Sequence, residues 1–177
     1  MKNNYEQTTY ETCLACCLLQ FIDSVKLNQD LELECINYSM KFSKEDFVIG
    51  HLNFITEKFG IEIERIVDNK LFFDYIMKIK TSELIHTEVK KINLDLIDNL
   101  LQKSSVILYI DAYYFYKIVH YPHFITVLNK EGKNYKLLDN WDGKEKIIDE
   151  EILSQSIISL RNHLKFCPQI IILNKNL

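Results

Sequence analysis

Glycine and proline are scarce in this chain of 177 residues, which contains four glycines and two prolines. Loops that bind phosphates or dinucleotides depend on closely spaced glycines, and the sequence has no such motif. No apolar run approaches the roughly 18 to 20 residues that a membrane-spanning helix needs. Basic residues are not in excess either, because the net charge is −4, whereas nucleic-acid-binding proteins usually present a basic surface. We therefore expect partners that are neither nucleic acids nor membranes.

Metal-binding and export patterns are also missing. Cys13 and Cys16 form one CxxC pair inside an apolar segment, but no second pair of Cys or His follows at zinc-finger spacing. The polar residues 1–13 do not resemble a signal peptide. We therefore expect a cytoplasmic chain without a metal, whose five cysteines are reduced.

The composition is that of a globular protein, with 47% hydrophobic and 26% charged residues. A chain of this length buries a full core as one domain, which we expect to span residues 1–177. Hydrophobic periodicity and capping residues predict helices at 12–24, 30–42, 45–59, 70–79, 94–104 and 150–164. They predict strands at 61–67, 105–111 and 169–173, and two strands within 123–141 that are joined by a turn at 130–133.

Helical patterns dominate the first part of the chain and strand patterns the second, with no assignment for 80–92. Helices segregated from an antiparallel sheet indicate an α+β fold. We expect a helical lobe of about residues 1–104 packed on an antiparallel sheet lobe of about 105–177. The cysteine of the candidate site lies in the first lobe and its histidine and aspartate in the second.

Four residues together have the composition of a thiol active site: Gln7, Cys13, His123 and Asp139. Cys13 begins a predicted helix, where free backbone N–H groups favour a thiolate. His123 begins one predicted strand and Asp139 ends the next, so an antiparallel pair brings them close enough for an Nδ1–H to carboxylate bond. The amide of Gln7 lies six residues before the cysteine, where it can donate to an oxyanion.

Other residues compete for these roles. Cysteines 16, 17, 35 and 167 match small buried hydrophobic residues, the commoner role of a free cysteine. His120 lies only three residues before His123, but it is in a loop that precedes the strand. A packed Cys13 and a solvated His123 are the alternatives to a nucleophile and its base.

The order of these four residues resembles that of the papain-like superfamily. The Gln–x5–Cys opening, the His-Phe start of an apolar strand and the run Asp-Asn-Trp-Asp-Gly at 139–143 carry the resemblance. Aspartate in place of the usual asparagine is similar to the C39-like branch of bacteriocin-processing peptidases. Residues 108–141 are more specifically similar to the amino-terminal domain of the butirosin-biosynthesis acyltransferase family, with an apolar strand ending in Asp, an aromatic run and a His-x-x-His loop.

This resemblance implies an enzyme that moves an acyl group from a carrier-protein thioester, through the cysteine, to an amine. The implied setting is the biosynthesis of specialised metabolites such as nonribosomal peptide or thioamide antibiotics. The implied partners are an acyl or peptidyl carrier protein, whose phosphopantetheine arm holds the substrate, and a small-molecule amine, with no other cofactor. The expected substrate-binding residues are Asp111, Tyr113, Tyr114, Phe115, Tyr116, His120 and Trp141, of which the aromatic run would wall an acyl pocket.

Two other classes of function remain open. A C39-like cysteine peptidase or amidase uses the same chemistry up to the acyl-enzyme and then admits water. An interaction module that kept the fold would need no nucleophile. The context Thr12-Cys13-Leu14 departs from the Asp-Cys opening of the peptidases, and the sequence shows no membrane segment of a fused transporter. Both departures favour the acyltransferase.

Overall fold

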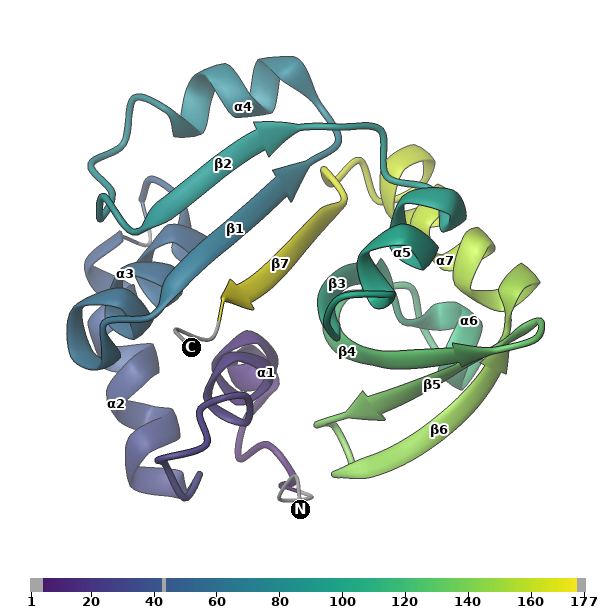
Figure 1. Ribbon diagram of the computed structural model, residues 1–177, viewed down its shortest axis with the longest axis horizontal. Coiled ribbons are helices and arrows are strands. Elements are labelled where there is room, and N and C mark those ends of the chain that lie inside the picture. The colour runs from purple at the N-terminus through teal and green to yellow at the C-terminus, as the bar shows by residue number, and fades with distance from the viewer. Residues whose placement is uncertain (1–4, 43, 175–177) are drawn as a thin grey trace.

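A computed structural model describes residues 5–42 and 44–174, which form one seven-stranded sheet with helices on both faces (Figure 1). The helices are α1 (Cys13–Leu19), α2 (Gln29–Ser39), α3 (Phe47–Phe59), α4 (Lys70–Ile76), α5 (Leu94–Leu101), α6 (Tyr113–Tyr116) and α7 (Glu150–Asn162), with 3-10 turns η1 (Tyr10–Thr12) and η2 (Met40–Phe42). The strands are β1 (Glu62–Val67), β2 (Ile85–Val89), β3 (Val106–Asp111), β4 (Pro122–Glu131), β5 (Asn134–Asp139), β6 (Lys144–Asp149) and β7 (Gln169–Asn174).

The strand order is β2-β1-β7-β3-β4-β5-β6. The expected α+β class is confirmed, but two details of the prediction are wrong. The sheet is mixed, because β1 and β2 run parallel while the other neighbouring strands are antiparallel. The division near residue 104 does not separate helices from strands, because β1 and β2 belong to the first part of the chain and extend the sheet through β7.

Local sequence signals account for most of the helices. An asparagine or aspartate side chain accepts a hydrogen bond from a first-turn backbone N–H at the start of five helices, and this satisfies donors that the helix leaves free. Gly60 ends α3 in a left-handed conformation with φ 67°, which glycine adopts without strain. The five capping residues are Asn28, Asp46, Asn69, Asn93 and Asp149.

Two hydrophobic clusters lie on opposite faces of the sheet. Alternate residues of a strand point to opposite faces, so in β3 Ile107 joins one cluster and Leu108 the other. Helices α1, α2 and α3 cover the Ile107 face, and α5 and α7 cover the Leu108 face. In Figure 1, α1 lies between α2 and the strands β4–β6. The helix that begins with Cys13 therefore rests on the strand that carries His123.

The residues from 5 to 42 and from 44 to 174 include no helix that is long and apolar enough to cross a membrane.

Candidate active site

Cys13 is the first residue of α1 and follows directly on the turn η1. It is partly exposed, whereas the next six residues of the helix are buried. Its thiol lies close enough to the His123 side chain to raise the pKa of that imidazole. The fold therefore brings together a cysteine of the N-terminal helix and a histidine that is 110 residues away in the sequence.

His123 lies at the start of β4 with only 1% of its surface exposed. Its Nε2 lies 2.9 Å from Oδ1 of Asp139, at the end of β5. The structure thus brings the two residues together, but it corrects the expected Nδ1 contact. Because Nε2 holds the carboxylate, Nδ1 is the ring nitrogen left for the thiol of Cys13.

The pKa of His123 is raised to about 9. Burial on its own lowers the pKa of an imidazole, but the hydrogen bond to Asp139 and the proximity of Cys13 raise it and outweigh that effect. At neutral pH the His123 ring therefore carries a proton. A protonated ring beside a cysteine favours the thiolate, which is the nucleophilic form of the residue.

Four donors surround the carboxylate of Asp139. Oδ1 accepts from His123 Nε2 and from the backbone N–H of Trp141 at 2.9 Å, and Oδ2 accepts from the Tyr116 hydroxyl and from Lys146 Nζ at 3.0 Å. Burial raises the pKa of this carboxyl, but His123, Tyr116 and Lys146 outweigh it and hold the pKa well below its usual value. Asp139 is therefore a fixed anion that orients the imidazole.

Sequence reasoning missed Lys146 and assigned Tyr116 to a substrate pocket. Lys146 lies on β6, which the sequence analysis did not predict, and it donates to both the Tyr116 hydroxyl (2.7 Å) and Asp139. Tyr116 comes from α6 and contacts Asp139 across the strands. Residues 144–149 do not alternate between charged and apolar side chains, so they give no clear strand signal and do not indicate what the lysine would contact.

A buried polar network joins α1 to the strands. Asn140 is fully buried beside Asp139, and its Oδ1 accepts from Gln20 Nε2 at 3.2 Å and from the Cys17 thiol at 3.5 Å. Gln20 also donates to Thr126 Oγ1 of β4 at 2.8 Å. Because these contacts connect the cysteine helix to both histidine and aspartate strands, they set the position of Cys13 relative to His123.

Gln7 is held next to this network. Its backbone N–H donates to the carbonyl of Asn140 at 2.7 Å, and its side-chain Nε2 donates to the carbonyl of Thr9 at 2.9 Å. Gly143 permits the close approach of the turn, because a Cβ there would lie 3.0 Å from the backbone nitrogen of Glu6. The second hydrogen of the Gln7 amide remains available for an oxyanion. The expected role of Gln7 as an oxyanion donor stays a prediction.

Glu32 of α2 holds the same N-terminal segment from the other side. Its carboxylate accepts from the Tyr5 hydroxyl (2.6 Å) and from both the backbone N–H (2.7 Å) and hydroxyl (2.6 Å) of Thr8. Burial raises the pKa of Glu32, but hydrogen bonds from Thr12, Thr8 and Tyr5 outweigh it and lower the pKa. The segment that carries Gln7 is therefore held by Asn140 on one side and by Glu32 on the other.

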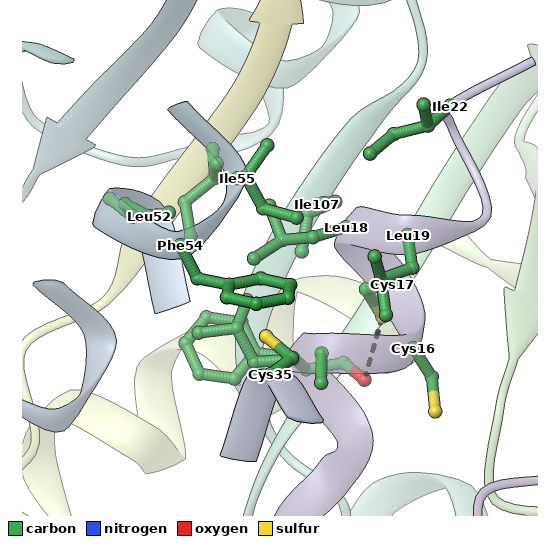
Figure 2. Close-up of a cluster of buried hydrophobic side chains, with 14 of the residues drawn as sticks. Cys16, Cys17, Leu18, Leu19, Ile22, Cys35, Leu52, Phe54, Ile55 and Ile107 are labelled. Carbon is green, nitrogen blue, oxygen red and sulfur yellow. Dashed lines mark hydrogen bonds between the residues drawn. The ribbon is translucent and has the colours of Figure 1, made fainter. Parts of the chain in front are cut away.

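The remaining cysteines are unlike Cys13. Cys16, Cys17 and Cys35 are fully buried, and Figure 2 shows Cys17 and Cys35 among apolar side chains of the core. Burial raises the pKa of all three thiols, which disfavours their thiolates. The expectation that they are packed hydrophobic residues is confirmed. Cys167 is partly buried, and burial raises its pKa too.

The predicted competitor His120 belongs to a second histidine–aspartate pair. Its Nδ1 lies 2.6 Å from Oδ2 of the buried Asp111, which also accepts from the Ser159 hydroxyl at 2.6 Å. Tyr113 stacks on the His120 ring at 4.1 Å between centroids, and His163 lies 4.3 Å away on the same measure. These residues hold the loop between β3 and β4 against α7.

The other predicted aromatic residues separate into two groups. Tyr114 contacts Tyr113 and His120 edge to face, and Phe115 packs on the cluster beneath α5 and α7. Trp141 instead lies beside His123, with its ring centroid 6.4 Å from the imidazole. Two residues that the sequence analysis did not select complete this second group, because Tyr10 and Tyr121 contact Trp141 at 4.7 and 6.0 Å. Tyr121 and Trp141 lie against the imidazole, and Tyr10 packs on both of them.

Cys13 opens into a pocket of about 470 Å³, within the range of about 300–1,000 Å³ that is typical of small-molecule sites. The sequence analysis expected residues 113–116 to form the aromatic wall of the acyl pocket. None of them lines this pocket, and its aromatic residues come from other elements. Phe47 of α3, Phe72 of α4, Tyr109 of β3 and Phe124 of β4 supply most of it, together with Tyr10 and Phe166. The other lining residues are Glu11, Leu14, Glu45, Asp46, Val48, Pro122, Cys167 and Gln169.

No protein-family model matches the chain, and no curated protein sequence matches it. A thiol, a protonated imidazole and a fixed carboxylate beside an apolar pocket are able to form a covalent acyl intermediate.

We expect Asn140→Ala to slow acylation of Cys13 by about tenfold or more, because small displacements of reacting groups are costly. The substitution removes the acceptor shared by Gln20 and Cys17, and it should lower the free energy of unfolding by about 1–3 kcal/mol. Acylation rates and urea unfolding measure the two effects. Asn134→Ala, at an exposed position of β5, is the matched control. A destabilised Asn140→Ala protein that still acylates at the wild-type rate would contradict the positioning role.

Proposed function

We propose that this chain is a papain-like cysteine acyltransferase that forms an amide from a carrier-protein thioester and an amine. One observation carries the proposal: at an apolar pocket, Cys13 lies close enough to His123 to raise the pKa of its ring, and the same ring is hydrogen-bonded to Asp139. The order of these residues and their resemblance to the butirosin-type acyltransferases support the same conclusion. The substrate would arrive on the phosphopantetheine arm of an acyl or peptidyl carrier protein.

The first step transfers the acyl group to the enzyme. The thiolate of Cys13 attacks the thioester carbonyl, and the resulting oxyanion accepts a hydrogen bond from the free side-chain N–H of Gln7. When the intermediate collapses, the bond to the carrier sulfur breaks and His123 gives its proton to that sulfur. Asp139 keeps the imidazole in place throughout, because its carboxylate holds Nε2.

The second step forms the amide. The amine nitrogen attacks the acyl-enzyme carbonyl, His123 takes one proton from the nitrogen, and the Cys13 thiolate leaves. Thiolate and protonated imidazole are thereby restored. Water competes with the amine for the same intermediate. The rings of Tyr121 and Trp141 against the buried His123 support transfer to the amine, because they limit access of water to the base.

The test is incubation with a carrier-protein thioester, with and without a small primary amine. We expect a mass increase on Cys13 equal to the acyl group, followed by an amide product whose rate rises with amine concentration. Mass spectrometry of the protein and of the small-molecule products measures both. If only free acid forms at every amine concentration, the chain is a hydrolase of the C39-like peptidase or amidase type.

A further inference from the structure

A second pocket, of about 390 Å³, adjoins the pocket of Cys13. Phe72, Phe166 and Cys167 line both pockets. Phe166 has 46% of its surface exposed, so its ring is an apolar ledge at the surface between the two pockets. A ligand that occupies both therefore has to lie across this ring. The second pocket is called the basic pocket below, and its remaining lining residues are Asp68, Asn69, Lys91, Arg161, Lys165 and Pro168.

The two pockets differ in charge. The basic pocket is lined by three cationic side chains, those of Lys91, Arg161 and Lys165, and by a single carboxylate, that of Asp68. The side chains with a full charge that line the pocket of Cys13 are all carboxylates. The chain as a whole has a net charge of −4, so the positive excess is a local feature. A ligand with an anionic group at one end is therefore attracted with that end in the basic pocket and away from Cys13.

Asp68 fixes one of the three cations and leaves the other two open to a ligand. Its Oδ2 accepts from Arg161 Nε at 2.6 Å, and its Oδ1 accepts from the backbone N–H of Ile92 at 2.6 Å. Lys91 Nζ lies 3.6 Å from Oδ2, beyond hydrogen-bonding distance, and 66% of its side chain is exposed. Lys165 is exposed as well and makes no ion pair among residues 5–42 and 44–174. The two ammonium groups are thus available to an incoming anion.

The backbone of Lys165 is a second, independent observation. Its φ is 61°, in the left-handed region that glycine adopts without strain and that is costly for other residues. Lys117 has a similar φ of 57°, and its ammonium group lies over the rings of Tyr113 and Tyr114, at 5.4 and 4.9 Å from their centroids. Lys165 has no comparable contact within the described part of the chain. A strained residue without a structural partner indicates that its side chain is used for binding.

The basic pocket lies at the same edge of the sheet as His123. His123 pairs with Ile110 of β3, and the register of β3 with β7 continues to Ile110 opposite Pro168. The backbone N–H of Asp68, at the end of β1, donates to the Pro168 carbonyl at 3.2 Å, and Figure 1 shows the loop that enters β7 beside that end. Three strand spacings of about 4.8 Å thus place Asp68 roughly 14 Å from His123.

This separation matches the length of a phosphopantetheine arm. About thirteen covalent bonds separate its sulfur from its phosphorus, and an extended chain advances roughly 1.2 Å per bond, so the arm spans about 15 Å. With the thioester at Cys13, the phosphate of an extended arm therefore reaches the basic pocket.

We propose that the basic pocket binds the phosphate of the thioester donor, with Lys165 as the residue that recognises it and with the arm lying across Phe166. This assignment rests on the proposed acyl transfer at Cys13, and it adds the site that holds the far end of the arm. Ammonium and guanidinium groups donate charge-assisted hydrogen bonds to phosphate oxygens. The same arm occurs on carrier proteins and on coenzyme A, and the phosphate is the chemistry that these donors share.

A binding measurement separates this inference from the proposed chemistry. The Cys13→Ala protein cannot be acylated on that residue, so calorimetry with S-acetylpantetheine and S-acetylphosphopantetheine measures recognition of the arm alone. We expect Kd to be about tenfold lower for the phosphorylated compound, and we expect the difference to shrink at high salt because the ammonium groups are exposed. Equal Kd values, or no binding of either compound, would overturn the inference even if Cys13 of the wild type is acylated. A preference for the phosphate in a protein that no thioester acylates would support the basic pocket and refute the acyltransferase.

Lys165→Gly tests the residue itself, and Lys117→Gly is the matched control. Each substitution removes one positive charge at a position with positive φ, where glycine is unstrained, so both proteins should fold, which urea unfolding checks. Lys117 lines neither pocket. In the Cys13→Ala background we expect Lys165→Gly to lose most of the tenfold preference for the phosphorylated compound and Lys117→Gly to retain it. A full preference in Lys165→Gly, or an equal loss in both variants, would contradict the assignment.

Two donors distinguish the sources of the arm. The acetyl thioesters of a carrier protein and of coenzyme A are compared as donors to Cys13, and the donor with the higher kcat/KM identifies the source. Lys165→Gly should lower kcat/KM about tenfold for that donor, in agreement with the binding measurement. If the substitution lowers kcat/KM for neither donor, the phosphate does not bind in the basic pocket and the inference is wrong.

Discussion

Cys13→Ala is expected to abolish acylation completely, because no other described cysteine combines partial exposure with a histidine partner. His123→Ala should lower the acylation rate by about 10²–10⁴, the usual contribution of a positioned acid–base group. The physical reason is that the raised pKa of His123 keeps a proton on the ring at neutral pH, where it favours the thiolate and then protonates the leaving sulfur. Intact-protein mass spectrometry after exposure to a thioester measures both effects.

Two substitutions are matched controls for this prediction. Cys16→Ala removes a thiol one turn away that is fully buried, and His120→Ala removes the neighbouring histidine that is paired with Asp111. Both proteins should be acylated on Cys13. Acylation that persists in Cys13→Ala, or that disappears in His120→Ala but not in His123→Ala, would mean that nucleophile or base has been assigned to the wrong residue.

Asp139→Ala is expected to have the largest effect on stability as well as a large effect on turnover. It leaves a buried imidazolium without its carboxylate, and removal of one partner of a buried pair typically costs about 3–5 kcal/mol. Asp139→Asn should be less damaging, since an amide oxygen can still accept from His123 Nε2. It should not restore full function, because Lys146 and the Tyr116 hydroxyl also face this carboxylate.

The pH dependence of this loss follows from the two pKa shifts. His123 has its pKa raised from 6.5 to about 9, so its contribution to stability is complete below pH 6.5 and is lost as the pH rises through about 9. Asp139 has its pKa lowered, so its contribution is present above pH 3.8 and is lost as the pH falls. The difference in unfolding free energy between wild type and Asp139→Ala should therefore be greatest between pH 3.8 and 6.5.

Urea unfolding over a pH series measures this difference, and Asp111→Ala provides the comparison. Asp111 is also a buried carboxylate with a histidine partner, so its loss should destabilise the protein but leave Cys13 open to acylation. The opposite pattern, in which Asp111→Ala abolishes turnover and Asp139→Ala leaves it intact, would show that the third member of the site is misassigned.

Local signals predicted the elements that depend on neighbouring residues. The helix over 94–104 has a capping Asn93 and an apolar face, and α5 forms at Leu94–Leu101. The turn expected at 130–133 joins β4 to β5, with Gly132 at φ 61°. Each of these signals operates within about one helical turn or one hairpin, so a linear pattern contains the information.

Pairing between distant strands was not predictable in the same way. Strand β2 falls in the unassigned residues 80–92, and β6 was not expected at all. Because β6 was not predicted, the sequence could not place Lys146 beside Asp139. Because the pairing of β1 with β7 was not predicted, the sequence could not place Arg65 beside Gln169. The residues of the pocket wall come from α1, α3, α4, β3, β4 and β7, which no local pattern connects.

The sequence by itself determined the kinds of residue available for chemistry and their order: an amide, a thiol, an imidazole and a carboxylate at Gln7, Cys13, His123 and Asp139. The tertiary structure alone decided which imidazole nitrogen meets the carboxylate, that Tyr116 supports Asp139, and that residues outside the aromatic run enclose the pocket. The physical reason is that hydrogen bonds and burial depend on distances between side chains far apart in the chain. The pairing of β4 with β5 and the packing of the helices on the sheet set those distances.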